Sequence, residues 1–114
     1  MVNKWDICFC NLDPTQGSEQ KGVRPVLVIS NNAVNHNLPV STVLPLSSVK
    51  SSDKIYPTEV MLEVGITGLP KNSVAMVQQI RTVAHSRLEN PIKNLQDAEA
   101  REKILETIRM YFEL

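Results

Sequence analysis

The chain has 114 residues, with 12 Lys and Arg against 12 Asp and Glu, 42% hydrophobic residues and 4% aromatic residues. This size predicts a single domain over residues 1–114 with a core of its own, and the hydrophobic content excludes a disordered chain. Residues 26–29, the longest aliphatic run, are too short to cross a membrane, and the N-terminus lacks a signal-like apolar stretch, so we expect a cytoplasmic protein.

The zero net charge argues against a protein that coats nucleic acid with a broad basic surface, but it leaves room for a local basic groove. The charges are also distributed unevenly. Residues 1–94 hold nine Lys and Arg and seven Asp and Glu, whereas residues 95–114 hold three and five. The acid is therefore concentrated in the C-terminal segment.

The first predicted strand, residues 5–12, is apolar on both sides and should be covered on both faces. Cys8 and Cys10 lie on one side of it, where their Cα atoms would be roughly 6.5–7 Å apart, at the limit for a relaxed disulfide. His36 and His85 do not have the spacing of metal ligands. We expect two buried, reduced thiols and no metal site.

A second strand is predicted at residues 25–30, after a long polar loop at residues 13–24 in which Gly17 and Gly22 permit turns. Loops of this length in a small domain are usually functional or disordered. Residues 31–37 predict a short helical turn or capped loop. Asn31 and Asn35 are its expected capping residues.

Residues 40–46 predict a third strand, and Pro45 near its end indicates an edge or a bulge. A second exposed loop follows at residues 47–57. Two more strands, at residues 58–62 and 73–80, are separated by a turn at residues 63–72. Five short strands suggest a small barrel or a half-open sheet.

The hydrophobic period changes from Asp97, which can cap a helix. One stripe of this helix should pack on the sheet, and it consists of Ile104, Leu105, Ile108, Tyr111 and Phe112. The predicted fold is thus mainly β, a small barrel closed by a C-terminal helix.

The two polar loops flank strands that could be neighbours, so we expect their tips to form one concave site. The first loop supplies Ser18, Glu19, Gln20, Lys21 and Arg24. The second supplies Ser47 and Lys50.

Residues 11–31, which read NLDPTQGSEQKGVRPVLVISN, closely resemble the signature of the MazF/PemK family of toxins. Residues 43–48 are similar to the family's strand that ends in a hydroxyl residue. Residues 77–83, followed by Arg87 and Leu88, are similar to its third motif. The resemblance covers nearly the whole chain in order.

This resemblance implies the SH3-like barrel of the CcdB, MazF and Kid toxins and a homodimer. It also implies a metal-independent endoribonuclease that needs no cofactor, cuts single-stranded RNA at specific sequences and is neutralised by an antitoxin protein. Arg24 matches the family's catalytic arginine, and Ser47 stands where the family carries a catalytic Thr or Ser.

Cleavage of RNA without a metal uses the 2′-hydroxyl as nucleophile and leaves a 2′,3′-cyclic phosphate and a 5′-hydroxyl. Arg24 would stabilise the charge on phosphorus, since an arginine is a poor proton donor or acceptor. Glu19 is the nearest candidate for the base, although an exposed loop glutamate is more often solvated or in contact with a nucleobase.

We also expect substrate contacts from Ser18, Gln20, Lys21 and Lys50, which supply the polar and cationic groups of the two loops. Gln78 and Gln79 can either read base edges or bond to a neighbouring loop, and the sequence favours neither. For Arg81 we expect a buried ion pair rather than a phosphate contact.

The chain departs from the family at several positions. Trp5 and Lys21 replace frequent glycines, and Met76, Gln78 and Ser18 replace the alternative catalytic set of one branch. A different class of function stays open, because the related CcdB toxins use this barrel to poison gyrase without catalysis.

Overall fold

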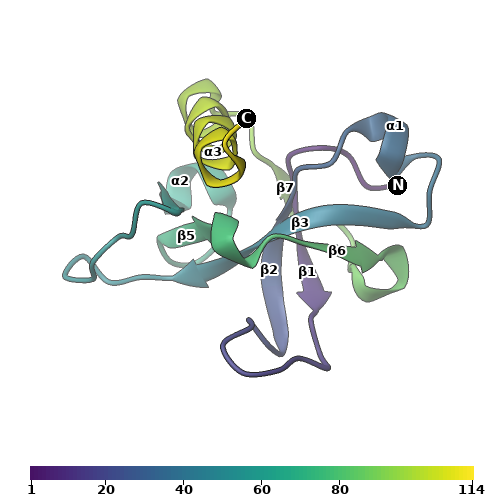
Figure 1. The fold of residues 1–114 in the computed structure, drawn as a ribbon, viewed down its shortest axis with the longest axis horizontal. Helices are drawn as coiled ribbons and strands as arrows, with labels where there is room; N and C mark the ends of the chain where they lie inside the picture. Colours follow the sequence, from purple (N-terminus) through teal and green to yellow (C-terminus); the bar gives the residue numbers. More distant parts are fainter.

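The computed structural model describes residues 1–114 and contains seven strands, three α-helices and two 3₁₀ turns (Figure 1). The strands are β1 (Asp6–Asn11), β2 (Val23–Val28), β3 (Val40–Ser48), β4 (Glu59–Leu62), β5 (Ser73–Met76), β6 (Arg81–Ala84) and β7 (Lys93–Asn94). The helices are α1 (Asn32–Asn35), α2 (Val64–Thr67) and α3 (Ala98–Phe112), and the 3₁₀ turns are η1 (Val77–Gln79) and η2 (His85–Arg87).

Every strand pairing is antiparallel, and the sheet runs in the order β4-β5-β3-β2-β1-β7 with β6 also paired to β3. Figure 1 shows the sheet curling around its core, with α3 lying across the end that carries β5 and α2. The expected mainly β fold with a C-terminal helix is confirmed.

The long strand β3 connects the two parts of this sheet. It pairs with β2 on one edge, and on its other edge first with β6 and then with β5. The change of partner falls between Val43, the last β6 partner, and Leu46, the first β5 partner. Pro45 lies in this gap, where a residue without an N–H is tolerated. The sequence predicts an edge or a bulge at Pro45. The residue is locally without a partner on one side, although β3 as a whole is paired on both of its edges.

The core consists of two groups of buried side chains that follow the two faces of β1. Ile7 belongs to the larger group, with Leu27, Leu44 and Ile104, whereas Cys8 and Cys10 belong to the smaller group with Val26 and Val43. Because β1 is covered on both faces, both sides of it are apolar, as predicted.

The strand ends differ from the predicted ones for identifiable reasons. β2 begins at Val23 instead of residue 25, since Val23 and Arg24 pair with Asn11 and Cys10 of β1. The predicted strand at residues 73–80 ends at Met76, where the chain turns into η1. The short strands β6 and β7 and the helix α2 have too few residues to produce a recognisable hydrophobic period.

The two asparagines expected to be caps behave differently. Asn31 caps α1 by accepting a hydrogen bond from the Ala33 N–H at 2.7 Å. Asn35 lies inside α1 and is buried, with its Oδ1 accepting from the Ser41 hydroxyl at 2.7 Å and its Nδ2 donating to the Ser30 carbonyl. Asn35 therefore anchors α1 to β3 and does not cap a helix.

Helix α3 begins as predicted, with Asp97 accepting a hydrogen bond from the Ala100 N–H at 2.9 Å. Only the first part of its apolar stripe packs as expected. Ile104 is buried, but Tyr111 and Phe112 are 41% and 48% exposed. No helix in the structure has the length and hydrophobicity needed to cross a membrane.

Candidate functional site

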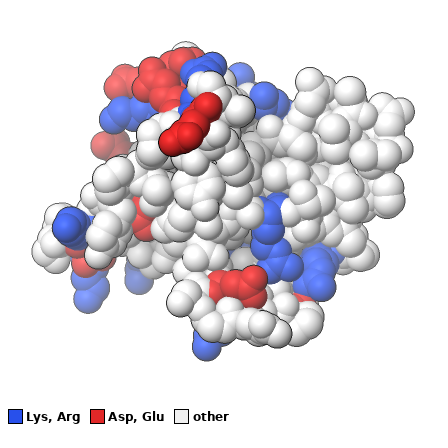
Figure 2. All heavy atoms as spheres, viewed as in Figure 1, with Lys and Arg blue, Asp and Glu red and all other residues white.

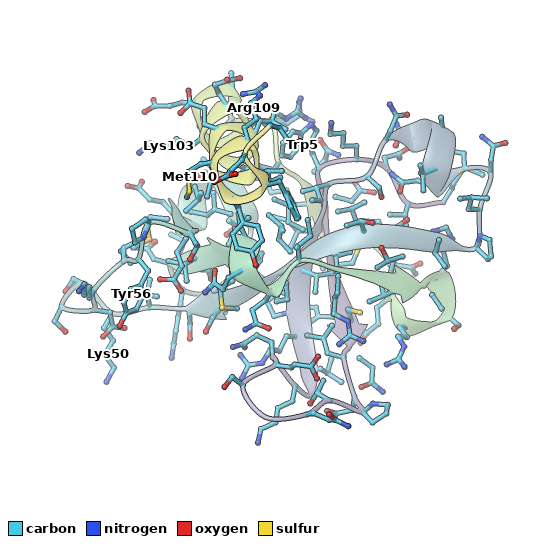
Figure 3. All side chains as sticks on the ribbon, viewed as in Figure 1. Trp5, Lys50, Tyr56, Lys103, Arg109 and Met110 are labelled. Carbon is cyan, nitrogen blue, oxygen red and sulfur yellow. The ribbon has the colours of Figure 1, made fainter.

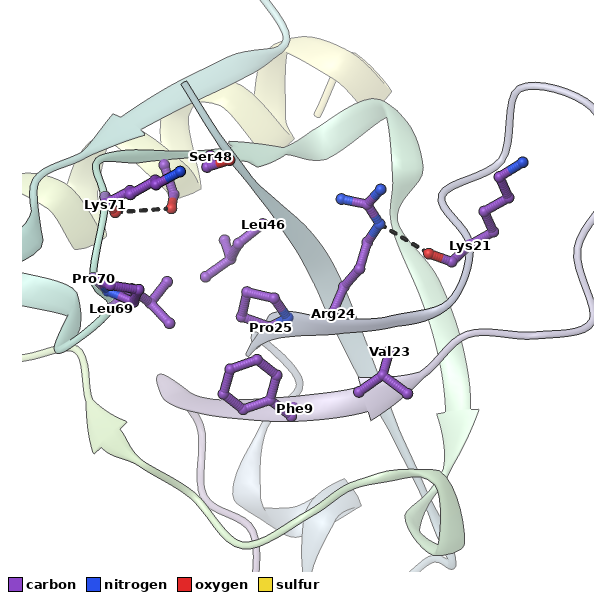
Figure 4. A pocket seen from close by; sticks show the side chains of 11 residues that line it. Phe9, Lys21, Val23, Arg24, Pro25, Leu46, Ser48, Leu69, Pro70 and Lys71 are labelled. Atoms are coloured by element: carbon purple, nitrogen blue, oxygen red, sulfur yellow. Dashed lines mark hydrogen bonds between the residues drawn. The ribbon is translucent and has the colours of Figure 1, made fainter. Parts of the chain in front are cut away.

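Arg24 projects from β2 just after the turn at Gly22, whose φ of 78° is readily adopted only by glycine. Its Nε donates to the Lys21 carbonyl at 2.9 Å, as Figure 4 shows, so the guanidinium is held by its inner nitrogen. Its two terminal nitrogens have no partner within the chain. Arg24 can therefore offer two parallel N–H donors and a fixed positive charge to an anion.

Ser47 lies on β3 at the same end of the sheet as Arg24. The pairs between β2 and β3 end with Val26 opposite Pro45, and Arg24 and Ser47 each lie two residues beyond that pair. Ser47 itself pairs with Val74 of β5 and lines neither of the two cavities described below. The Ser47 hydroxyl is half-buried and makes no hydrogen bond in the structure.

A cavity of about 340 Å³ lies at this strand end, and Arg24 is one of its lining residues (Figure 4). It has a largely apolar floor and a rim of cations and hydroxyls. Its lining residues are Phe9, Lys21, Val23, Arg24, Pro25, Leu46, Ser48, Leu69, Pro70, Lys71 and Ser73. We call it the Arg24 cavity.

A second cavity of about 430 Å³ is more polar, and we call it the Gln79 cavity. It is lined by Ser18, Glu19, Gln20, Pro45, Gln78, Gln79, Ile80 and Arg81. The loop between β1 and β2 separates the two cavities, since Gln20 lines one and Lys21 lines the other. Most of the predicted site residues lie in one cavity or the other.

The two glutamines of η1, which the sequence could not distinguish, have different roles. Gln79 Oε1 accepts from the Gln20 N–H at 3.3 Å, and its Nε2 donates to the Ser18 carbonyl at 3.2 Å. Gln79 thus ties the β1–β2 loop to η1. Gln78 is exposed and has no hydrogen-bond partner, so its amide is free to bind a ligand.

The remaining polar residues of the loop are less suited to chemistry. Glu19 Oε1 accepts from the Gln16 N–H at 2.6 Å, a contact that closes the turn, and Glu19 lines the Gln79 cavity instead of the cavity with Arg24. Gln20 Oε1 is buried without a partner. An unpaired buried oxygen destabilises the docked loop by about 1–3 kcal/mol.

The expectation of one concave site formed by two loop tips is wrong. The loop at residues 49–58 projects away from the β1–β2 loop, as the position of Lys50 in Figure 3 shows. The Lys50 N–H donates to Asp53 Oδ2 at 2.8 Å, and Lys50 lines neither cavity. Only Ser48, at the base of that loop, reaches the Arg24 cavity.

The ion pair expected for Arg81 is absent. Its Nη1 donates to the Leu12 carbonyl at 3.0 Å, and the chain's one ion pair joins Arg109 and Glu102 on α3. Arg81 is half-buried at the Gln79 cavity. It holds the start of the β1–β2 loop through a backbone oxygen.

The two cysteines are buried free thiols, as expected. Burial, reinforced by the charges of Asp6 and Cys10, raises the pKa of Cys8 to about 12. Burial also raises the pKa of Cys10, although Arg81 and Arg87 oppose the rise. Both cysteines are therefore protonated at neutral pH and are not nucleophiles.

The sequence did not reveal Lys71 and Leu69 as site residues. They belong to the turn between α2 and β5, some 45 residues from Arg24 in the chain. They reach the Arg24 cavity because β5 pairs with the end of β3, with Ser47 opposite Val74 and Ser48 opposite Ser73. Only the strand order could have indicated this.

The charged side chains gather in a few places on the surface. Figure 2 shows acidic side chains over α3, mixed with Lys and Arg, and a group of Lys and Arg near the β1–β2 loop. The three cations of the Arg24 cavity, Lys21, Arg24 and Lys71, have no acidic residue among its lining residues. This cavity therefore favours an anion.

The chain matches, over residues 3–112, the family described as PemK-like, MazF-like toxin of type II toxin-antitoxin system. It is 36% identical over 110 residues to endoribonuclease EndoA of Bacillus subtilis, which covers 96% of this chain and 93% of that protein. It is also 36% identical over 102 residues to endoribonuclease MazF of Staphylococcus saprophyticus, covering 90% and 84%.

Solved structures agree with the fold. The Mycobacterium tuberculosis toxin MazF-mt6 is 25% identical with a TM-score of 0.76, covering 96% of this chain and 97% of that one. MazF from Deinococcus radiodurans is 24% identical with a TM-score of 0.84, covering 99% and 97%.

Proposed function

Since this chain belongs to the family of PemK-like, MazF-like toxins of type II toxin-antitoxin systems, we propose that it is an endoribonuclease that cuts single-stranded RNA at specific sequences. One observation carries the proposal for this chain. Arg24 presents two guanidinium nitrogens without hydrogen-bond partners in the chain at a cavity whose charged lining residues are all cations.

The reaction we propose is an internal phosphoryl transfer. The ribose 2′-oxygen forms a bond to the adjacent phosphorus, and the bond from phosphorus to the 5′-oxygen of the next nucleotide breaks. The 2′-hydroxyl loses its proton, and the leaving 5′-oxygen gains one. The products are a 2′,3′-cyclic phosphate and a 5′-hydroxyl, with no metal or cofactor involved.

Arg24 would stabilise the negative charge that builds up on the non-bridging oxygens. Donors aimed at developing charge contribute about 3–4 kcal/mol each in sites that exclude water. Ser47, at the same end of the sheet, would donate a further hydrogen bond to the same phosphate. The Nε bond to the Lys21 carbonyl fixes the guanidinium before the substrate arrives, so little reorganisation is needed.

We assign Glu19 to closing the loop turn rather than to proton transfer, because its carboxylate already accepts the Gln16 N–H and lies at the other cavity. The only titratable side chains that line the Arg24 cavity are Lys21, Arg24 and Lys71, which are cationic at neutral pH. The 2′-proton would then pass to water, and a lysine could supply the proton of the leaving oxygen.

Membership of a toxin-antitoxin family also supports a cognate antitoxin protein as a partner and a homodimer as the active form. The exposed apolar end of α3 suits such self-association. We place the activity in the cytoplasm, where messenger RNA is available.

The central test compares Arg24→Ala with Arg109→Ala, which removes an equally charged residue from the exposed face of α3. Purified proteins are incubated with a long, defined transcript in EDTA, and the cut ends are mapped. We expect the wild type and Arg109→Ala to cut at the same few sites, while Arg24→Ala loses at least about 100-fold in rate. Circular dichroism and gel filtration check that the variants remain folded.

Two results would contradict the proposal. Undiminished cleavage by folded Arg24→Ala would remove Arg24 from the reaction. Failure of the wild type to cut any RNA would favour a non-catalytic toxin that binds a protein target, like the gyrase poison CcdB.

A further inference from the structure

We propose that the Arg24 cavity binds the nucleotide next to the scissile phosphate, with its base on the apolar floor and Lys71 binding the neighbouring phosphate. This inference rests on the proposed endoribonuclease activity and deepens it. It adds a subsite and a phosphate-binding residue from the turn between α2 and β5.

The arrangement of the lining residues gives the cavity two charged ends. Figure 4 shows Arg24 and Lys21 at one end, Lys71 at the other, and apolar side chains including Pro25 and Leu46 between them. A nucleotide has the same order of chemistry, with a phosphate on each side of an apolar base face. The match favours one nucleotide bridging from Arg24 to Lys71.

The size of the cavity suits this occupant. Its volume of about 340 Å³ lies at the lower end of the range for small-molecule sites. The floor combines an aromatic ring, Phe9, with the aliphatic side chains of Leu46 and Leu69. Aromatic and apolar faces are what unpaired RNA bases stack against.

Lys71 is held in place by its backbone, while its amine remains free. Its carbonyl accepts the Ser73 hydroxyl at 3.2 Å, and the next carbonyl, of Asn72, accepts the Val49 N–H at 2.9 Å. The turn is therefore fixed to the end of β3. No carboxylate lines the cavity or pairs with Lys71, so a phosphate is a suitable partner for its side chain.

The test measures binding of an RNA whose 2′-hydroxyl at the cut site is replaced by hydrogen, so that it cannot be cleaved. Each phosphate near the cut is replaced in turn by a neutral methylphosphonate. For the wild type we expect one linkage beside the cut whose neutralisation weakens binding about tenfold. For Lys71→Gln we expect the same tenfold loss with the normal RNA and no additional loss when that linkage is neutral.

Lys103→Gln, an equal charge change on α3, should behave as the wild type at every linkage. The base is tested separately by an abasic nucleotide beside the cut, which should weaken wild-type binding about 10-fold or more. Because Lys71 is exposed, Lys71→Gln should fold normally, and its thermal unfolding checks this.

The possible results distinguish a failure of the proposed subsite from a failure of the proposed endoribonuclease activity. If the wild type cuts no RNA, the endoribonuclease proposal itself fails. Two results with a wild type that cuts RNA would overturn the subsite assignment. In the first, Lys71→Gln binds normal RNA as tightly as the wild type. In the second, the loss of affinity caused by Lys71→Gln adds to the loss caused by each neutral linkage, with no linkage as an exception. A variant that binds RNA normally but loses the antitoxin would instead make the cavity a protein-binding site.

Discussion

Trp5 has a φ of 75°, a conformation in which a side chain is disfavoured by about 1–2 kcal/mol. Its ring nonetheless packs into the core at 8% exposure, with Lys4 Nζ and Arg101 Cζ each 5.3 Å from the ring centre. The buried ring and the two cation–π contacts offset the backbone strain.

We therefore expect Trp5→Gly to be destabilising overall. Losing roughly 150–200 Å² of apolar burial costs about 4–5 kcal/mol, and relief of the backbone returns 1–2 kcal/mol, leaving a net loss of about 3 kcal/mol. Trp5→Ala loses the ring without the relief and should be less stable than Trp5→Gly by about 1–2 kcal/mol. Urea unfolding measures both, and equal stability of the two variants would show that the backbone is not strained.

Glu19 provides a second test at this scale. If its carboxylate only closes the turn at Gln16, Glu19→Gln should reduce the cleavage rate less than about tenfold and leave the shape of the pH–rate profile unchanged. A general base would instead give a loss of at least about 100-fold and abolish the acidic limb. The profile is measured between pH 5 and 9 under single-turnover conditions.

Some residues of the candidate site could be predicted from the sequence, and others could not. Arg24 and Ser47 could be singled out from their motifs, and both lie at the same end of the paired strands β2 and β3. Gln78 and Gln79 could not be distinguished, because only the position of the β1–β2 loop decides which amide is occupied. Lys71 could not be predicted from the sequence, since its place at the cavity depends on a pairing between distant strands.

At the scale of elements, η1 and the β1–β2 loop form one unit through Gln79. The two bonds from its amide are long, at 3.3 and 3.2 Å, and the docked loop also buries the unpaired Gln20 Oε1. The loop is therefore held only weakly. It matters for catalysis because the Lys21 carbonyl at its end orients Arg24.

We predict that Gln79→Leu, which keeps the size of the side chain but removes both bonds, releases this loop. Hydrogen exchange at the Gln20 amide should accelerate about 10-fold or more, and kcat/KM should fall by a similar factor as Arg24 loses its orientation. Gln78→Leu is the matched control for exchange, because Gln78 makes no bond to the loop. Unchanged exchange in Gln79→Leu would refute the coupling.

Helices and strands could be predicted from the sequence where their hydrophobic pattern extends over many residues. The apolar strand β1, the aliphatic part of β3 and the capped start of α3 each extend over enough residues to show a period. The sequence predicts a strand that continues through η1, because Val77 and Ile80 are apolar, whereas the chain turns between these two residues. Tertiary pairing, not local sequence, sets that boundary.

For the whole molecule, the neutral total charge conceals an uneven distribution. Residues 95–114 hold five Asp and Glu against three Lys and Arg, whereas the charged lining residues of the Arg24 cavity are all cations. The far end of α3 is also apolar and exposed, with the Tyr111 and Phe112 rings packed edge to face at 5.0 Å. Met110 and Leu114 extend this surface. A second copy of the chain is the occupant that we propose for it.

We expect Phe112→Glu to weaken the proposed dimer, because dimerisation would then bury a charge without a partner. In sedimentation experiments the wild type should have about twice the chain mass of 12.8 kDa, and Phe112→Glu should approach the monomer at micromolar concentration. Asn90→Glu adds the same charge to an exposed loop and should remain dimeric. An unchanged mass for Phe112→Glu would place the interface elsewhere.

The central position of β3 has a consequence for how this protein loses activity. A strand bonded to β2, β5 and β6 cannot detach without disrupting the whole sheet, and its C-terminal end carries Ser47. Amides in the middle of β3 should therefore exchange only through global unfolding, with the slowest rates in the chain. Ser47 would then lose its position only when the fold melts, whereas the β1–β2 loop that orients Arg24 can be released locally.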